Sequence, residues 1–271
     1  MNLSRFQLEE LSLRRIGDAV RRRVEDIPQL FSWYFSAYNN SFNLRNLEKF
    51  HNIHKGERCF IVGNGPSLKK MDLSLLNNEY SFGMNRIYLL FENTTFRPTY
   101  YVASNELVLE QFVSDISSLK IPKFLNWNRR KYFPNDDNQT MFFKVNFGIN
   151  DFFGTDPRRP ICGGGTVTYV AMQLAYFMGF QEVILIGVDH NFADKGTPNI
   201  TEVRRAEKDD NHFHPSYFPK GALWQLPDLR HSEAAYRLAR KTFEGDGRKI
   251  LDATIGGKCP VFQKVDFYSL F

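Results

Sequence analysis

From residue 56 onward, short apolar segments alternate with helical stretches, and this alternation limits the possible folds more than any other feature of the chain. Thr166–Met178 and Ser232–Phe243 have the apolar spacing of helices, and Gly179 follows the first as its expected C-cap. Strands that alternate with helices form βαβ units and pair in parallel. The sequence therefore predicts the α/β class, with a Rossmann-like, open and mostly parallel sheet flanked by helices. The segments expected to form its strands are Cys59–Val62, Ser81–Met84, Pro98–Ala103, Ile121–Leu125, Met141–Val145, Glu182–Val188 and Lys249–Ala253.

Size and composition narrow the class of protein. The 271 residues have room for one large domain and an appendage. No apolar stretch reaches the ~20 residues that span a bilayer, and the N-terminus lacks the pattern of a secretory signal. The three cysteines show no metal-ligand spacing, so we expect a cytoplasmic protein with reduced thiols. The net charge of +5 suits anionic ligands, but it is too dispersed to indicate nucleic acid.

Residues 1–50 form an expected helical appendage, and residues 51–271 form the expected nucleotide-sugar-binding catalytic domain. Apolar residues of the appendage recur at helical spacing among arginines, and Pro28 is expected to end this helix before an aromatic-rich stretch. Residues 10–36 can therefore contact the inner face of the plasma membrane, with rings in the headgroup layer and arginines on anionic lipid. The alternative is a helix that packs on the catalytic domain or on a second subunit of a homo-oligomer. The apolar residues are Leu13, Ile16, Val20, Val24 and Ile27, and the arginines are Arg14, Arg15, Arg21, Arg22 and Arg23.

The first expected strand runs into the turn Gly63-Asn64-Gly65-Pro66-Ser67. Glycines let the backbone turn sharply and let a ligand approach, while free amides at a helix start attract an anion. The turn lacks the third glycine of the dinucleotide fingerprint and the Lys-Ser/Thr of a P-loop. It is therefore either one wall of a nucleotide site or a plain connection between a strand and a helix.

An asparagine follows each of the first three expected strands: Asn64, Asn85 and Asn105. In an open parallel sheet, ligands bind outside the carboxyl ends of the strands. Each side-chain amide offers two donors and an acceptor, as recognition of a base and a ribose requires. Singly each asparagine is typical of a turn, but together they indicate a nucleoside site.

A second glycine-rich turn, Gly163–Thr168, precedes the helix at 166–178. Gly164 and Gly165 can expose backbone amides, and the hydroxyls of Thr166 and Thr168 can supplement them around a phosphate. The alternative is a flexible loop with an ordinary threonine N-cap.

The stretch 190–228 lacks periodicity and is expected to be a lid over the site. It contains His212 and His214 shortly after Asp209 and Asp210. Imidazole titrates near neutral pH, so a general base is one interpretation of these histidines. A metal site is the other, although no third ligand has a convincing spacing. No Asp-x-Asp motif appears that would clamp the metal of a nucleoside diphosphate sugar.

The segment Phe60–Lys69 resembles the opening of the bacterial sialyltransferases of glycosyltransferase family 42. Met84-Asn85-Arg86 and Ser104-Asn105-Glu106 are similar to that family's further nucleotide-contacting sites, and 166–189 is similar to its middle block. The resemblance covers residues 57–255. It extends equally to the wider domain-of-unknown-function family 115, which includes flagellin-modifying proteins and an archaeal hydroxymethylpterin diphosphokinase.

The resemblance implies a GT-A-like variant of the fold and an inverting glycosyltransferase without an obligatory cofactor or metal. It implies a CMP-activated nonulosonic acid such as sialic acid as donor, and a cell-surface glycan or lipid-linked saccharide as acceptor. His214, ahead of His212, would be the base, and Tyr217 would donate to the departing phosphate. After Asp189, the chain has His190 where the sialyltransferases carry aromatic residues. The positions that the resemblance places at the donor are Gly63, Asn64, Gly65, Ser67, Asn85, Ser104, Asn105, Gly164, Gly165, Thr166, Thr168 and Asp189.

Two other functions remain open from the sequence. A diphosphokinase-like phosphotransferase would use ATP and Mg²⁺, with Asp209 and Asp210 as metal ligands. A non-catalytic nucleotide-binding protein could use the same fold, since function depends on the site and not on the architecture.

Overall fold

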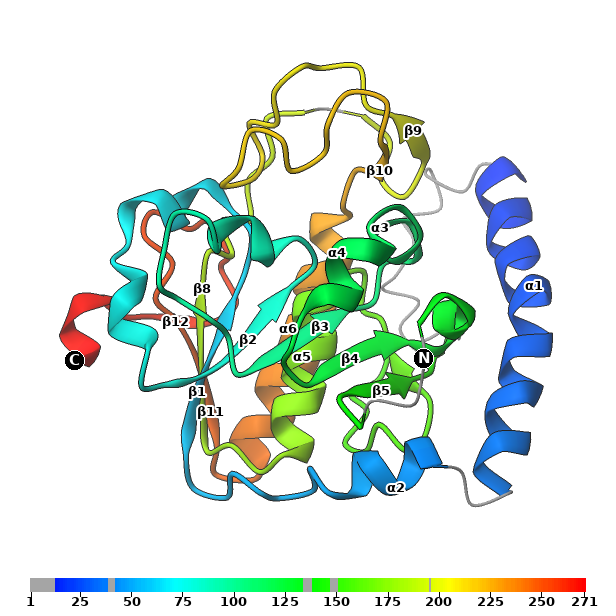
Figure 1. Ribbon diagram of the computed structural model, residues 1–271, viewed down its shortest axis with the longest axis horizontal. Coiled ribbons are helices and arrows are strands. Elements are labelled where there is room, and N and C mark those ends of the chain that lie inside the picture. Colours follow the sequence, from blue (N-terminus) through cyan, green and yellow to red (C-terminus); the bar gives the residue numbers. More distant parts are fainter. Residues whose placement is uncertain (1–12, 39–41, 134–137, 147–150, 195) are drawn as a thin grey trace.

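A parallel sheet of eight strands organises the computed structural model, which describes residues 13–38, 42–133, 138–146, 151–194 and 196–271 (Figure 1). The strand order is β12-β11-β8-β1-β2-β3-β4-β5, and every neighbouring pair is parallel. This arrangement confirms the predicted Rossmann-like α/β fold. The chain order reverses between β8 and β1, which makes their carboxyl ends a topological switch point. The strands are β1 (Arg58–Val62), β2 (Tyr80–Met84), β3 (Tyr100–Ala103), β4 (Lys123–Asn126), β5 (Thr140–Phe143), β8 (Glu182–Ile186), β11 (Lys249–Asp252) and β12 (Gln263–Lys264).

Helices flank this sheet, and two of them, α5 and α6, begin at the carboxyl-end edge of the strands. Helices α5 and α6 pack on each other and against the strands. Thr166 caps α5 by accepting the Thr168 amide, and Gly179 follows the helix with a φ of +92°, as the sequence predicts. The helices are α1 (Leu13–Tyr38), α2 (Phe42–Glu48), α3 (Glu106–Gln111), α4 (Val113–Ser118), α5 (Val167–Phe177) and α6 (Leu229–Gly245). Short 3₁₀ turns occupy Pro66–Lys70, Leu73–Leu76, Ile87–Leu90, Trp127–Tyr132 and Tyr268–Leu270.

The segment expected to be a lid lies beyond the carboxyl ends of the strands (Figure 1). It carries a short antiparallel pair, β9 (Thr201–Val203) with β10 (Leu223–Gln225). A second small pair, β6 (Val145–Asn146) with β7 (Ile161–Cys162), lies just before the second glycine-rich turn.

Helix α1 runs through Pro28, so the expectation that this proline ends the helix is wrong. A proline inside a helix removes one hydrogen bond, and here the unpaired carbonyl belongs to Val24, a residue that is 59% exposed. Contacts on the opposite side hold the helix both before and after the proline, through Asp26 and Trp33.

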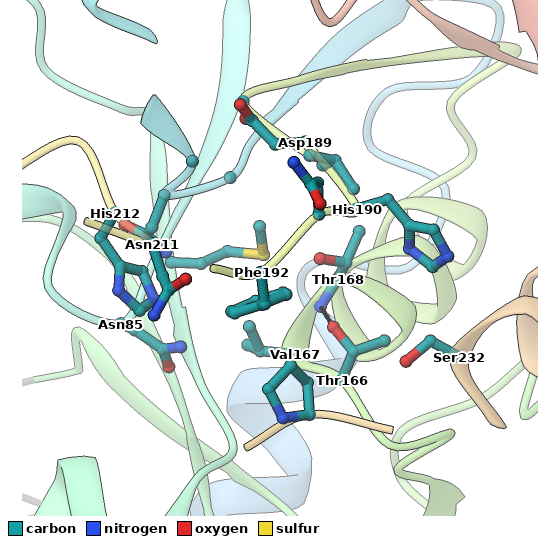
Figure 2. Close-up of a pocket in the computed structure, with 18 of the residues that line it drawn as sticks. Asn85, Thr166, Val167, Thr168, Asp189, His190, Phe192, Asn211, His212 and Ser232 are labelled. Atoms are coloured by element: carbon teal, nitrogen blue, oxygen red, sulfur yellow. Dashed lines mark hydrogen bonds between the residues drawn. The ribbon is translucent and has the colours of Figure 1, made fainter. Parts of the chain in front are cut away.

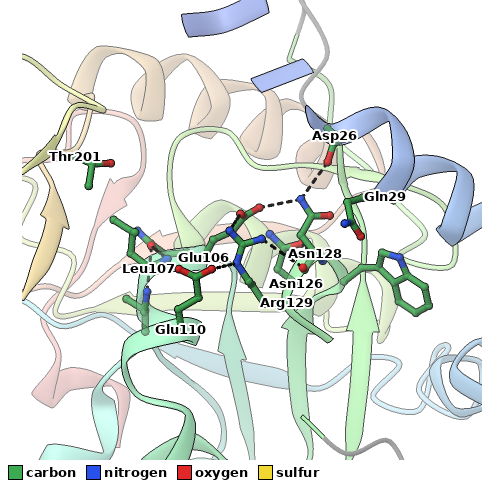
Figure 3. A network of polar contacts seen from close by, with 12 residues as sticks. Asp26, Gln29, Glu106, Leu107, Glu110, Asn126, Asn128, Arg129 and Thr201 are labelled. Carbon is green, nitrogen blue, oxygen red and sulfur yellow. Dashed lines mark hydrogen bonds and ion pairs between the residues drawn. The ribbon is translucent and has the colours of Figure 1, made fainter. Parts of the chain in front are cut away.

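These contacts fix α1 beside the β5 edge of the sheet (Figures 1 and 3). Both carboxylate oxygens of Asp26 accept hydrogen bonds from the buried Lys144 ammonium, at 2.7 and 2.8 Å. Asp26 also accepts from the amide of Asn128, which in turn donates to Glu106 of α3. The outer side of α1 carries exposed apolar residues, among them Val24, Phe31 and Phe35. No helix in the described part of the chain is long and apolar enough to cross a membrane.

Candidate nucleotide site

A cavity of about 700 Å³, part of it open to solvent, lies at the carboxyl ends of β1, β2 and β8 (Figure 2). The start of α5, the start of α6 and the 190–228 segment complete its walls. The residues that line it include Gly63, Asn64, Gly65, Met84, Asn85, Thr166, Val167, Thr168, Asp189, His190, Asn191, Phe192, Asn211, His212, Tyr217, Ser232 and Tyr236. The cavity is therefore at the place where an open parallel sheet binds its ligand.

The glycine turn after β1 packs directly on the end of β8. The amide of Gly63 donates to Ile186 at 2.7 Å, and the amide of Gly65 donates to Gly187 at 2.8 Å. A Cβ on Gly63 would lie 2.2 Å from the Gly187 carbonyl oxygen, closer than atoms can approach. Both glycines are thus required by close contact between two strand ends, and they bring the backbone to the cavity wall.

Asp189, which follows β8, is held by the other end of the same turn. Its carboxylate accepts from the Ser67 amide at 3.0 Å and from the Ser67 hydroxyl at 2.7 Å. Burial raises the pKa of Asp189, and the two bonds from Ser67 oppose that shift. Ser67 does not line the cavity; it positions Asp189, which does.

Two of the three predicted asparagines line the cavity. The Oδ1 atoms of Asn64 and Asn85 are buried and accept no hydrogen bond from the described residues. Asn85 has a φ of +49°, an uncommon backbone conformation that an asparagine tolerates better than most residues. Buried acceptors without donors are rare in folded proteins. Both atoms are therefore suited to a ligand that brings N–H or O–H groups.

The third predicted asparagine, Asn105, and its neighbour Ser104 are not part of the cavity lining. The Asn105 side chain caps α3 instead, accepting the amides of Leu107 at 2.9 Å and Val108 at 3.3 Å. The Ser104 carbonyl accepts the side-chain amide of Asn126 at 3.0 Å. An asparagine that caps a helix and one that binds a ligand are alike in sequence, which is why the pattern could not separate them.

The start of α5 forms the wall opposite Asn85, with Thr166 and Thr168 on the cavity (Figure 2). Tyr236 of α6 also lines the cavity; burial raises its pKa to about 12, and the side chains of Thr166 and Thr168 oppose that shift. A helix N-terminus carries a partial positive charge and unpaired amides. Hydroxyls and helix start together can hold an anionic group such as a phosphate.

The resemblance places the two glycines of this turn, Gly164 and Gly165, at the donor, but neither of them lines the cavity. They have positive φ values of +54° and +75°, and they turn the chain into the helix. A Cβ on Gly164 would collide with the Tyr169 ring at 2.3 Å, and one on Gly165 would lie 2.9 Å from His231. Their role is to let the turn pack closely against its neighbours.

His212 is the lid histidine on the cavity. Its Nδ1 lies 2.9 Å from Asp209, and its ring stacks on Tyr217 with centroids 3.8 Å apart. Burial alone would raise the pKa of Asp209, but the hydrogen bond and charge of His212 and the Asn211 amide outweigh it and lower that pKa. When Nδ1 donates to the carboxylate, Nε2 carries the lone pair that a general base needs.

The structure does not support the preference for His214. This side chain is absent from the cavity lining, and its Nδ1 accepts the Ser216 amide at 3.2 Å. The buried Phe213 separates the two histidines, and its amide donates to the Asn64 carbonyl at 2.9 Å. That bond ties the lid to the glycine turn and directs His212 inward.

His190 is a cavity residue to which the sequence assigned no role. It follows Asp189 with a φ of +55°, and its Nε2 lies 3.1 Å from Glu233 of α6. Backbone strain of this kind persists where surrounding contacts enforce it, often at functional sites. The sequence marks this position only because it has a histidine where the sialyltransferases have aromatic residues.

His231 also pairs with a carboxylate: its Nε2 lies 2.9 Å from Asp151, next to Gly165 and outside the cavity lining.

The charge inside the cavity is low. Among the described residues, no lysine or arginine lines it, and its ionisable members are Asp189, His190, His212, Tyr217 and Tyr236. The described residues also contain no group of three or more metal-ligating side chains. Asp209, considered above as a metal ligand, accepts from His212 and from the Asn211 and Phe218 amides, whereas Asp210 is exposed.

Comparisons with known proteins agree with the wider resemblance. The structure of MAf glycosyltransferase from Magnetospirillum magneticum AMB-1 is similar with a TM-score of 0.51 and 14% identity, over 85% of this chain and 39% of that chain. This chain thus spans about two fifths of that protein's length, and the likeness shows a shared fold. No curated protein sequence matches the chain. Neither comparison identifies glycosyltransferase family 42 specifically. The model of the family described as 6-hydroxymethylpterin diphosphokinase MptE-like matches residues 35–195, more than half of the chain, and the protein belongs to this MptE-like family.

Proposed function

We propose that this protein is a glycosyltransferase that moves a nonulosonic acid from a CMP-activated donor to a cell-surface glycan or lipid-linked acceptor. The observation that carries the proposal is one cavity with three parts: two buried acceptors without donors, a helix start with two threonines, and a histidine paired to a carboxylate. These parts match a nucleoside, a phosphate and an acceptor hydroxyl.

The asparagine side supports a nucleoside that brings hydrogen-bond donors. Asn64 and Asn85 each present a buried Oδ1 atom without a partner among the described residues. The exocyclic amine of cytosine and the ribose hydroxyls are donors of the required kind. Leaving a buried acceptor unpaired costs about 1–3 kcal/mol, which such a ligand would recover.

The low charge of the cavity favours a donor with one phosphate. A CMP-activated nonulosonic acid carries one charge on its phosphodiester and one on its sugar carboxylate, whereas a nucleoside diphosphate sugar carries two adjacent charges on its diphosphate. The start of α5 supplies roughly half a positive charge, and the described lining adds no lysine or arginine. At the start of α5, the single charge of a phosphodiester is therefore easier to hold than the two adjacent charges of a diphosphate.

His212 is the proposed general base. Its Nε2 takes the proton from the acceptor hydroxyl while that oxygen attacks the anomeric carbon of the donor. The bond between the anomeric carbon and the phosphate oxygen breaks, its electron pair leaves with CMP, and the configuration inverts. Asp209 holds the ring through Nδ1 and stabilises the imidazolium that forms. Tyr217 and Tyr236 remain protonated because burial raises the pKa of each, so both can donate to the departing phosphate.

The family description favours a second candidate, a phosphotransferase that uses ATP and Mg²⁺. Its activity would require the divalent metal, and it would transfer a diphosphate rather than a sugar. The two candidates therefore differ in nucleotide, metal requirement and product.

The test is turnover of a panel of activated sugars, with water or an added saccharide as the acceptor of the sugar. The nucleotide released is identified by chromatography. The proposal expects CMP release in the presence of EDTA, and a rate about 10²–10⁴-fold lower for His212→Gln. His51→Gln is the matched control, because that side chain is 44% exposed and is not part of the cavity lining. Release of AMP from ATP only with Mg²⁺, and none of CMP, would replace this function with the second candidate.

A further inference from the structure

We propose that the outer side of α1 is a docking surface for an anionic membrane. The proposal does not rest on the glycosyltransferase function, because it concerns a helix of which no described residue lines the cavity. It resolves the two alternatives that the sequence left for this segment by assigning one to each side of the helix. One side packs on the domain, and the other faces a lipid surface.

The inner side of α1 is fixed to the domain by polar and aromatic contacts. Asp26 pairs with the buried Lys144, Gln29 accepts from Arg130 at 2.8 Å, and the Trp33 ring meets Trp127 edge-on at 5.2 Å. Figure 3 shows Asp26 on the side of α1 that faces Asn128. Trp33 is only 2% exposed, so it anchors the helix as a core residue. These contacts set the rotation of α1 and hence decide which residues face outward.

The outer side carries a continuous apolar stripe. Its first five members are separated by four, three, four and three residues, which aligns them on one face of a helix, and a sixth lies beside the last. Two phenylalanines of the stripe are each 71% exposed, a large apolar surface to leave in water. The stripe consists of Val20 (53% exposed), Val24 (59%), Ile27 (48%), Phe31 (71%), Tyr34 (54%) and Phe35 (71%).

The charge of the helix identifies the partner. Helix α1 contains five arginines and three carboxylates, and the arginines all lie between residues 14 and 23, next to the start of the stripe. Of these carboxylates, Asp26 is paired with Lys144 and Glu25 lies 3.9 Å from Arg21, so the helix keeps an excess of positive charge. An amphipathic helix that carries basic residues and an apolar stripe binds in the headgroup layer of anionic lipid, with its apolar side chains in the acyl boundary.

A second copy of the chain fits this surface less well. Parallel pairing of two α1 helices would bring their arginine clusters together, which is repulsive. Antiparallel pairing would set the arginines against Phe31, Tyr34 and Phe35, with no carboxylate opposite them in the stripe. Lipid phosphates supply the negative charge that a second copy lacks.

The experiment measures sedimentation of the full chain with vesicles of phosphatidylcholine alone, and with vesicles that also contain phosphatidylglycerol. Binding is expected only to the anionic vesicles and is expected to weaken as salt is raised. Val24→Asp should lower the partition coefficient by about tenfold or more, because it removes an apolar contact and adds a repelled charge. Val203→Asp is the matched control, since Val203 is 54% exposed on β9 and should leave binding unchanged.

Thermal unfolding of both variants establishes that they are folded, as expected for substitutions at exposed positions. Absence of binding to anionic vesicles would overturn the proposal, and so would equal losses for the two variants. A chain that is dimeric in solution, becomes monomeric on Val24→Asp and binds no vesicles would assign the stripe to self-association instead.

Discussion

Replacement of Gly63 by alanine tests whether the glycine turn is required by the contact between β1 and β8. The added Cβ would lie 2.2 Å from the carbonyl oxygen and 2.6 Å from the carbonyl carbon of Gly187. These atoms belong to backbone at the end of a buried strand, so no side chain can rotate away to make room. The two strand ends must separate, and the bond from the Gly63 amide to Ile186 must lengthen.

The loss of stability can be estimated from these contacts. Overpacking a well-packed core costs about 1–3 kcal/mol, and weakening one buried hydrogen bond costs about 1 kcal/mol more. The expected loss is therefore about 2–4 kcal/mol. For a chain of 271 residues, this lowers the melting temperature by about 4–7 °C.

The assay is urea unfolding followed by tryptophan fluorescence, combined with calorimetric titration of CMP. Gly17→Ala is the matched control: nothing lies within 4 Å of its Cβ, it is inside α1, and it should stabilise the protein by about 0.5–1 kcal/mol. A Gly63→Ala protein that unfolds at the wild-type urea concentration and binds CMP equally well would refute the reasoning.

Three further predictions concern carboxylates. Asp209→Asn should lower turnover by about 10²–10⁴-fold with little change in nucleotide affinity, because Asp209 orients His212 and is not part of the cavity lining; an equal loss of affinity would contradict this role. Asp26→Ala leaves the buried Lys144 ammonium without that carboxylate and should reduce the free energy of unfolding by about 3 kcal/mol, whereas Glu25→Ala, at an exposed pair, should change it by less than about 1 kcal/mol. Burial raises the pKa of Asp189, so its carboxyl group stays protonated to higher pH in the folded protein than in the unfolded chain. The contribution of this residue to stability therefore falls as the pH rises from about 3.9 through the raised pKa. Urea unfolding of Asp189→Asn against pH should therefore show the variant gaining stability relative to the wild type across that window, and a constant difference would contradict the assignment.

The sheet could be predicted from the sequence because its strands are buried on both faces. Continuous apolar runs such as Glu182–Ile186, bounded by glycines and polar residues, have few other structures available to them. The cap residues Thr166 and Gly179 were equally predictable, since their chemistry matches one position at a helix end. Pro28 was not, because the contacts that keep the helix intact come from residues distant in the sequence.

The site could be predicted only in part. The asparagines that follow the strands located the cavity, but their recurrence could not show that the side-chain oxygen of Asn105 accepts a hydrogen bond from the start of a helix instead. The lid sequence offered both His212 and His214, and the resemblance favoured His214, whereas the packing of Phe213 decides which of them faces the cavity. His190 depends on a positive φ and on Glu233 from a helix 43 residues away, neither of which has a local signal.

Calorimetric titration of the unaltered protein with CMP and with ATP, each with Mg²⁺ and with EDTA, tests the central claim most directly. We predict that CMP binds without a metal and at least about tenfold more tightly than ATP, and that Asn85→Ala weakens CMP binding by about tenfold through the loss of one buried acceptor. Binding of ATP that requires Mg²⁺ and exceeds that of CMP would contradict the assignment of this cavity to a CMP-activated sugar.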